Sequence, residues 1–174
     1  QFYNQTNPDV HHDTTGPEIW EQSGGRVTHF VASSGTGGTI SGVGRYLKAK
    51  NSAVRIVGID PEGSVIAPFF NTGEVLEGHP YKLEGIGNDK IPGTLDQETV
   101  GEYRTGGDGE AVRVARRRTR EEALFAGGSS GLLVHGAIQV AKELDDPDAF
   151  VVTLLPDWGE RYLSKAYDDD WMRD

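Results

Sequence analysis

A glycine-rich run, residues 35–39 with the order Gly-Thr-Gly-Gly-Thr, lies between an apolar segment and a segment typical of a helix. Residues 27–32 are mostly apolar, which predicts a buried strand. Residues 40–50 predict a helix, and residues 54–60 are apolar and β-branched. A strand, a helix and a second strand in this order predict a βαβ unit, whose two strands are parallel and joined by a right-handed crossover.

The rest of the chain continues this alternation. We expect a polar loop over residues 1–13 and further helices over 14–24, 108–120, 129–144 and 159–166. Residues 149–155 predict a last parallel strand, and the glycine-broken residues 65–107 predict short helices and a long functional loop around 84–87. The fold class predicted is α/β, with an open, mostly parallel sheet and helices on both faces. Ligands of such sheets bind at the carboxyl ends of the strands.

The composition of the chain limits the kinds of partner that it is expected to bind. The chain has 174 residues, one domain's worth, and a formal net charge of −10, which argues against nucleic acid or an anionic membrane as a partner. Without cysteine it can form no disulfide, and no apolar stretch is long enough to span a membrane. With no signal peptide visible, we expect a cytoplasmic protein. Adjacent His11 and His12 are expected in a solvated loop, so no metal site is predicted.

The glycine run has the composition of a phosphate-binding loop. Glycines let backbone N–H groups converge, and the following helix N-terminus favours an anion. Thr36 and Thr39 add hydroxyl donors. A Walker A loop requires a lysine that is missing here, and a dinucleotide fingerprint requires glycine where Ile40 stands. Both observations weaken the nucleotide interpretations. A nucleotide-binding α/β domain, a site for another phosphate and a tight turn without a ligand stay as alternatives.

Other clusters are less specific. Residues 127–131, Gly-Gly-Ser-Ser-Gly, form a second glycine-serine turn at a predicted helix start, which an ordinary helix cap also explains. The arginine-rich residues 113–120 are followed by Glu121 and Glu122, a pattern typical of a solvated helix face. Neither cluster changes the functional interpretation by itself.

Together the segments resemble the fold-type II pyridoxal phosphate enzymes, the cystathionine β-synthase and cysteine synthase family. The resemblance covers nearly the whole chain and rests on motifs in the family's order, at residues 1–8, 12–20, 35–39, 84–87, 127–129 and 155–157. It implies pyridoxal 5'-phosphate as cofactor. It also implies the large-domain portion of the tryptophan synthase β-like fold over residues 1–174.

The resemblance implies roles for residues of this chain that stand at the family's site positions. For the cofactor, the resemblance implies a phosphate loop formed by Gly35, Thr36, Gly37, Gly38 and Thr39, and a hydroxyl at the pyridine nitrogen from Ser129. For the amino-acid substrate, it implies contacts from Gln1, Gly85 and Ile86. A neutral serine does not hold the pyridine nitrogen protonated, which suits β-elimination better than transamination.

Within the family, residues 60–64, Glu84, Asp89 and the ending 167–172 are similar to cystathionine β-synthases. This similarity implies β-replacement at serine, with L-serine and L-homocysteine giving cystathionine. The alternative is cysteine synthesis from an activated serine and sulfide. Two positions depart from the pattern: Asn88 stands where tyrosine is frequent, and Trp158 stands where a small serine is usual.

The lysine that forms the family's Schiff base has no counterpart here. The six lysines are Lys48, Lys50, Lys82, Lys90, Lys142 and Lys165, none of them in the family's context. We therefore assign no catalytic residue and expect an N-terminal half of the same enzyme as a partner, with a homodimer formed through an exposed apolar face. Alone the chain is expected to be inactive, and a non-catalytic module that binds a phosphate ligand or a partner is the alternative from another class.

Overall fold

A parallel β-sheet is the centre of the computed structural model, which describes residues 1–173. Over these residues the sheet has the strand order β3-β2-β1-β4, and every neighbouring pair is parallel. The strands are β1 His29–Ser33, β2 Arg55–Pro61, β3 Glu102–Gly106 and β4 Val151–Thr153. Phe30 is in register with Ile56 on one side and Val152 on the other. The predicted open parallel α/β sheet is confirmed.

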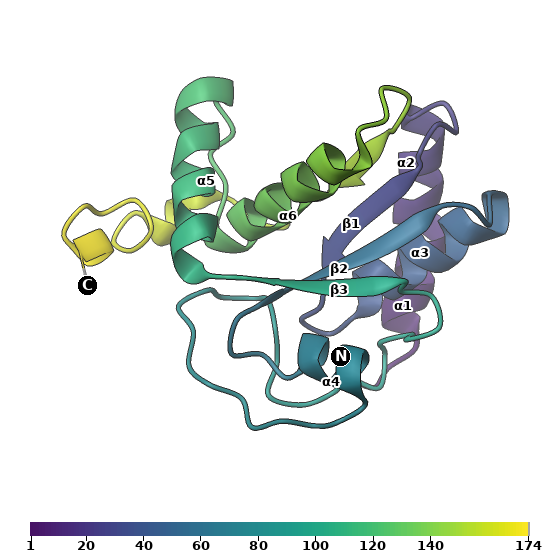
Figure 1. Ribbon diagram of the computed structural model, residues 1–174, viewed down its shortest axis with the longest axis horizontal. Coiled ribbons are helices and arrows are strands. Elements are labelled where there is room, and N and C mark those ends of the chain that lie inside the picture. Colours follow the sequence, from purple (N-terminus) through teal and green to yellow (C-terminus); the bar gives the residue numbers. More distant parts are fainter. Residues whose placement is uncertain (174) are drawn as a thin grey trace.

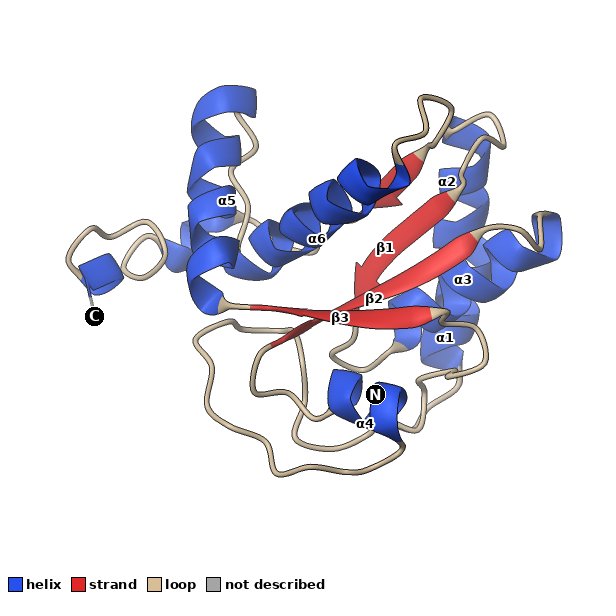
Figure 2. Ribbon diagram, in the orientation of Figure 1, coloured by secondary structure: helices blue, strands red, loops and turns tan. Residues whose placement is uncertain are grey.

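Helices cover both faces of this sheet (Figures 1 and 2). Because successive residues of a strand point to opposite faces of the sheet, β1 and β2 each contribute side chains to two hydrophobic cores, one on each face. One core joins them to α3, Gly38–Lys50, through Phe30, Ala32, Ile56, Ile40, Val43 and Leu47. The other joins them to α6, Gly128–Leu144, through Val31, Val57, Ile59, Leu132, Leu133 and Val140. The predicted placement of helices on both faces is therefore confirmed.

The N-terminal segment is helical from Thr6, so the loop predicted for residues 1–13 is wrong beyond residue 5, whereas the helix predicted over residues 14–24 is confirmed at Gly16–Gln22. Helix α1, Thr6–Val10, continues through the π-helical turn η1, His11–Thr15, into α2, Gly16–Gln22. Its polar residues face solvent, while small residues allow close packing on α3. A Cβ on Gly16 would lie 2.7 Å from Tyr46 Cβ, and a Cβ on Gly42 would lie 2.8 Å from His11 Cβ. Close backbone approach at these glycines, together with Ile19 and Trp20 packed against the core, fixes this segment.

The region between β2 and α6 has the short helix and the long loop that the sequence predicts, and differs from expectation in one strand. Helix α4, Ile66–Thr72, is followed by a long stretch without helix or strand, and then by β3, which the sequence did not predict. Only Tyr103 and Gly106 of β3 are buried, so this edge strand carries little apolar signal. Helix α5, Asp108–Glu122, begins at the predicted residue, but Asp108 accepts a hydrogen bond from the Lys82 amide rather than capping α5.

The C-terminal segment packs beside α5 (Figure 1). The helix predicted over residues 159–166 is only a 3₁₀ turn, η2 Gly159–Tyr162, and a second such turn, η3, spans Trp171–Arg173. Buried Tyr162 and Ala166 pack with Val112 of α5. Across residues 1–173, no helix is both long and apolar enough to cross a membrane.

Candidate functional site

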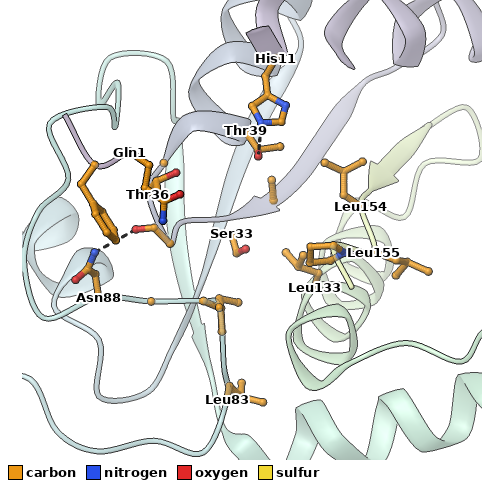
Figure 3. A pocket seen from close by; sticks show the side chains of 18 of the residues that line it. Gln1, His11, Ser33, Thr36, Thr39, Leu83, Asn88, Leu133, Leu154 and Leu155 are labelled. Carbon is orange, nitrogen blue, oxygen red and sulfur yellow. Dashed lines mark hydrogen bonds between the residues drawn. The ribbon is translucent and has the colours of Figure 1, made fainter. Parts of the chain in front are cut away.

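A cavity of about 750 Å³ opens where β1 ends, between the glycine loop and the loop around residues 81–89 (Figure 3). This is the edge of a parallel sheet at which ligands are expected. The cavity brings together most of the residues predicted to bind ligand, namely Gln1, Gly35, Thr36, Gly37, Thr39, Gly85 and Ile86. Gly38 and Ser129 are buried and do not line it.

The glycine loop forms one wall of the cavity and leads directly into α3. Gly37 is the N-cap residue and has φ 85°, in the left-handed region. A Cβ there would also lie 2.8 Å from Leu95 Cα, so both conformation and packing require glycine. The first amides of the 13-residue α3 lack intrahelical acceptors, and the helix dipole adds partial positive charge. This wall can therefore hold an anion.

The Thr36 hydroxyl is oriented by two neighbours. Its oxygen accepts a hydrogen bond from Asn7 Nδ2 at 2.9 Å and another from the Gly38 amide at 3.2 Å. Since both partners donate, the Thr36 O–H remains available to donate to a ligand oxygen. The Thr36 carbonyl accepts from Thr94 Oγ1 at 2.6 Å, which fixes the loop from the other side.

His11 also lines the cavity, although the sequence interpretation placed it in a solvated loop. Its Nε2 lies 3.1 Å from Thr39 Oγ1 (Figure 3). Its Nδ1 lies 3.0 Å from Thr15 Oγ1. Burial lowers the pKa of His11, which keeps the ring neutral at pH 7. The expectation of a solvated His11 is wrong because helical packing of residues 6–22 turns it toward Thr39. The spacing of His11 from Asn7, one helical turn, is a signal that could have placed both on the same face.

The facing wall is the segment around Gly85, Ile86 and Gly87. Both glycines have φ 74°, and the Gly85 carbonyl oxygen would lie 3.0 Å from a Cβ on Gly35. The Gly87 amide donates to the Ser34 carbonyl at 2.9 Å. The two loops thus meet through their backbones: close packing favours glycine at Gly35, and the positive φ favours glycine at Gly85 and Gly87.

Ser129 lies at the start of α6 and is held by a carboxylate. Its hydroxyl donates to Asp157 Oδ1 at 3.3 Å, as does that of Ser130 at 3.4 Å. The Tyr162 hydroxyl donates to the other oxygen of Asp157, and burial together with this carboxylate raises the pKa of Tyr162. The sequence interpretation did not single out the Asp157 side chain or Tyr162. Trp158, which stands where the family usually has a small serine, is 72% exposed and does not line the cavity.

The residues present fit a phosphate monoester attached to a flat ring. The cup offers the N-terminus of α3 and the Thr36 O–H, which remains able to donate, and the cavity continues past apolar Leu133 and Leu154. Among residues 1–173, no lysine lines this cavity. The cavity can therefore bind an anionic ligand, but the lining residues described offer no nucleophilic amine.

Comparison with known proteins agrees with this chemistry. Residues 1–157 match the family model described as pyridoxal-phosphate dependent enzyme, and the chain belongs to this family. The resemblance and the cofactor predicted from the motifs are thereby confirmed.

The chain is 39% identical over 172 residues to cystathionine beta-synthase of Apis mellifera, covering 99% of this chain and 34% of that protein. It is 43% identical over 174 residues to cystathionine beta-synthase of Oryctolagus cuniculus, covering 99% and 31%. The chain therefore spans about a third of the length of these relatives.

Proposed function

We propose that the protein containing this chain joins L-serine to L-homocysteine, giving cystathionine and water. The observation that carries the proposal is the glycine cup with a free Thr36 hydroxyl, facing a second loop across one cavity. Family membership and the names of both relatives support it. In the reaction the serine Cβ–O bond breaks, a Cβ–S bond forms, and the hydroxyl leaves as water.

Each wall of the cavity has its part in this proposal. The backbone amides of Gly35–Thr39 and the Thr36 hydroxyl hold the cofactor phosphate. Ser129 lies behind the cavity lining and bonds Asp157, so its assignment to the pyridine nitrogen requires its hydroxyl to turn toward the cavity. Gln1 binds the substrate carboxylate, and Gly85 and Ile86 contact the substrate from the opposite wall. When bound, pyridoxal phosphate supplies the electron sink that makes loss of the serine α-proton possible.

The catalytic lysine is proposed to come from a part of the enzyme outside this chain. The support is that none of the cavity-lining residues described within 1–173 is a lysine. Residues 1–174 then form part of the large domain of the catalytic core. Alone, the chain should bind pyridoxal phosphate without converting substrate, because no amine is placed to move the α-proton.

The decisive experiment offers the full-length protein two substrate pairs. Serine with homocysteine should turn over faster than O-acetylserine with sulfide. The opposite preference would replace the proposal with cysteine synthesis. A protein that binds pyridoxal phosphate, shows no visible band lost on borohydride reduction and converts neither pair would instead be a non-catalytic binding module.

We also propose that the protein is a homodimer. Leu124 and Leu155 line a shared hollow and are 44% and 41% exposed, and Trp158 pairs with Ala126 of the same hollow. Exposed apolar side chains grouped in this way are typical of interaction surfaces. Sedimentation equilibrium of the full-length protein tests this, with a monomer at micromolar concentration as the contradicting result.

A further inference from the structure

Two hydrogen bonds join the glycine loop to the facing wall of the cavity. The first is between backbones, from the Gly87 amide to the Ser34 carbonyl. The second uses a side chain: Asn88 Nδ2 donates to the Gly35 carbonyl at 3.2 Å (Figure 3). Gly35 is the first residue of the cup, so the second bond connects the wall directly to the loop that holds the phosphate.

The backbone of Asn88 is fixed independently of its side chain. Its amide donates to Ser64 Oγ at 3.0 Å, and its carbonyl accepts from the Val65 amide at 3.0 Å and from Ser64 Oγ at 3.2 Å. These bonds tie residue 88 to the start of α4. Replacement of the side chain should therefore leave the path of the chain unchanged at this point.

The side chain of Asn88 divides its two polar atoms between two tasks. Its Oδ1 accepts from the amides of Asp89 at 2.9 Å and Lys90 at 3.3 Å, which shapes the local turn. Its Nδ2 is the atom that reaches the cup. Because Oδ1 is committed to the turn, the amide orientation is fixed and only a donor at the other atom can bond the Gly35 carbonyl. An aspartate would keep the turn and lose the donor.

We propose that Asn88 is a positioning residue that couples phosphate occupancy of the cup to ordering of the wall formed by residues 84–89. The proposal rests on the proposed function, since it assigns the cup to phosphate and the wall to substrate. A ligand that fixes Gly35 also fixes the carbonyl that Asn88 bonds. The wall has no helix or strand of its own. The Gly87 amide bonds Ser34, which precedes the cup, whereas the Asn88 side chain bonds Gly35 of the cup itself, so the coupling is assigned to the Asn88 bond.

The test is hydrogen–deuterium exchange of the full-length protein, freed of cofactor and then titrated with pyridoxal phosphate or with inorganic phosphate. In the unaltered protein both ligands should slow exchange at residues 35–39 and at 84–90. The effect at 84–90 should be about five-fold, as one hydrogen bond is expected to give. In Asn88→Asp and Asn88→Ala, exchange at 35–39 should still slow, while 84–90 should change less than about two-fold.

The control is Asn71→Asp. Asn71 Nδ2 also donates to a backbone carbonyl, that of Tyr103 at 3.4 Å, and Asn71 does not line the cavity. This variant should respond like the unaltered protein at both segments. Steady-state kinetics give a second readout: the KM for the amino-acid substrate should rise about five-fold in Asn88→Asp with kcat within about two-fold, and neither should change in Asn71→Asp.

The outcomes separate this proposal from the proposed function. If the ligand fully protects residues 84–90 in Asn88→Asp, the coupling is overturned. It is also overturned if this protection is lost in Asn88→Ala but kept in Asn88→Asp, because the effect would then come from the turn at Asp89 and Lys90. If neither ligand protects residues 35–39 in the unaltered protein, the cup does not bind phosphate and the proposed function itself fails. Protection by pyridoxal phosphate but not by inorganic phosphate places the ordering contact on the ring and also overturns the coupling.

Discussion

Tyr103 on edge strand β3 and Ser34, directly after β1, hydrogen-bond to each other through their hydroxyls inside the core. Strand β2 lies between them in the sheet, and Tyr103 crosses it at Gly58, where a Cβ would meet the tyrosine ring. Ser34 immediately precedes the glycine cup, and its carbonyl accepts the Gly87 amide. A strand that contributes nothing to the cavity lining thus supports the cup from behind.

Removing this buried pair should show strong energetic coupling. Tyr103→Phe leaves the Ser34 hydroxyl buried without a partner and should lower the free energy of unfolding by about 1–3 kcal/mol. Ser34→Ala should cost a similar amount. The double variant should cost clearly less than the sum, because neither hydroxyl is left unsatisfied. Urea unfolding measures all three, and strictly additive losses would contradict the bond.

Gly37→Ala should damage both stability and cofactor binding. The left-handed φ of 85° costs an alanine about 1 kcal/mol, and the new Cβ would lie 2.8 Å from Leu95 Cα, so the cup must shift. Gly73→Ala is the matched control, since Gly73 has φ 76° and nothing within 4 Å of its Cβ position. The control should lose only the conformational term and bind pyridoxal phosphate normally. Equal effects of the two variants in unfolding and in binding titrations would argue against a packing requirement at Gly37.

Thr36→Val tests whether the free hydroxyl contacts the phosphate. Valine keeps the shape but removes both the O–H donor and the acceptor for Asn7 Nδ2. A hydrogen bond to a charged group contributes about 1.5–3 kcal/mol, so the dissociation constant for pyridoxal phosphate should rise about 10- to 100-fold. Thr36→Ser keeps the hydroxyl and should bind within about three-fold of the unaltered protein. Fluorescence titration of the cofactor-free protein measures both, and equal affinities of the valine and serine variants would exclude the contact.

Asp60 should make stability depend on pH in a direction unusual for a carboxylate. It is fully buried, its Oδ2 accepts the Ala67 amide at 2.9 Å, and burial raises its pKa from 3.8 to about 6. Between these pH values the folded state binds more protons than the unfolded state, so this group lowers stability as pH rises from about 4 to 6. The loss of unfolding free energy from Asp60 reaches on the order of 3 kcal/mol and is constant above the folded-state pKa.

Asp60→Asn removes the titration. The difference in unfolding free energy between the variant and the unaltered protein, measured in urea from pH 4.5 to 7.5, should shift in favour of the variant as pH rises. The test uses how each unfolding free energy changes with pH, not its absolute value. The cost of burying the asparagine amide is the same at every pH and so does not affect this change. A difference that stays constant over this range would show that Asp60 does not titrate there.

Much of the architecture could be predicted because it is encoded locally. The apolar residues of β1 and β2 and the intervening glycine turn specify a βαβ unit by their own periodicity and conformational preference. Edge strand β3 could not be found in this way, because only Tyr103 and Gly106 are buried and the rest reads as polar loop. The helical residues 6–15 were missed for a related reason: they carry little apolar signal, and close contact with Gly42 of α3 helps to hold them in place.

The sequence by itself determined the βαβ unit and the anion-binding composition of residues 35–39, since each depends on residues adjacent along the chain. It also determined the family, through the order of short motifs along the chain. Only the tertiary structure decided that His11 faces Thr39, that Asn88 reaches the Gly35 carbonyl and that Ser129 bonds Asp157. These contacts join residues between 28 and 53 positions apart. Each depends on how loops and helices pack around the end of β1, and no local pattern of residue types specifies that packing.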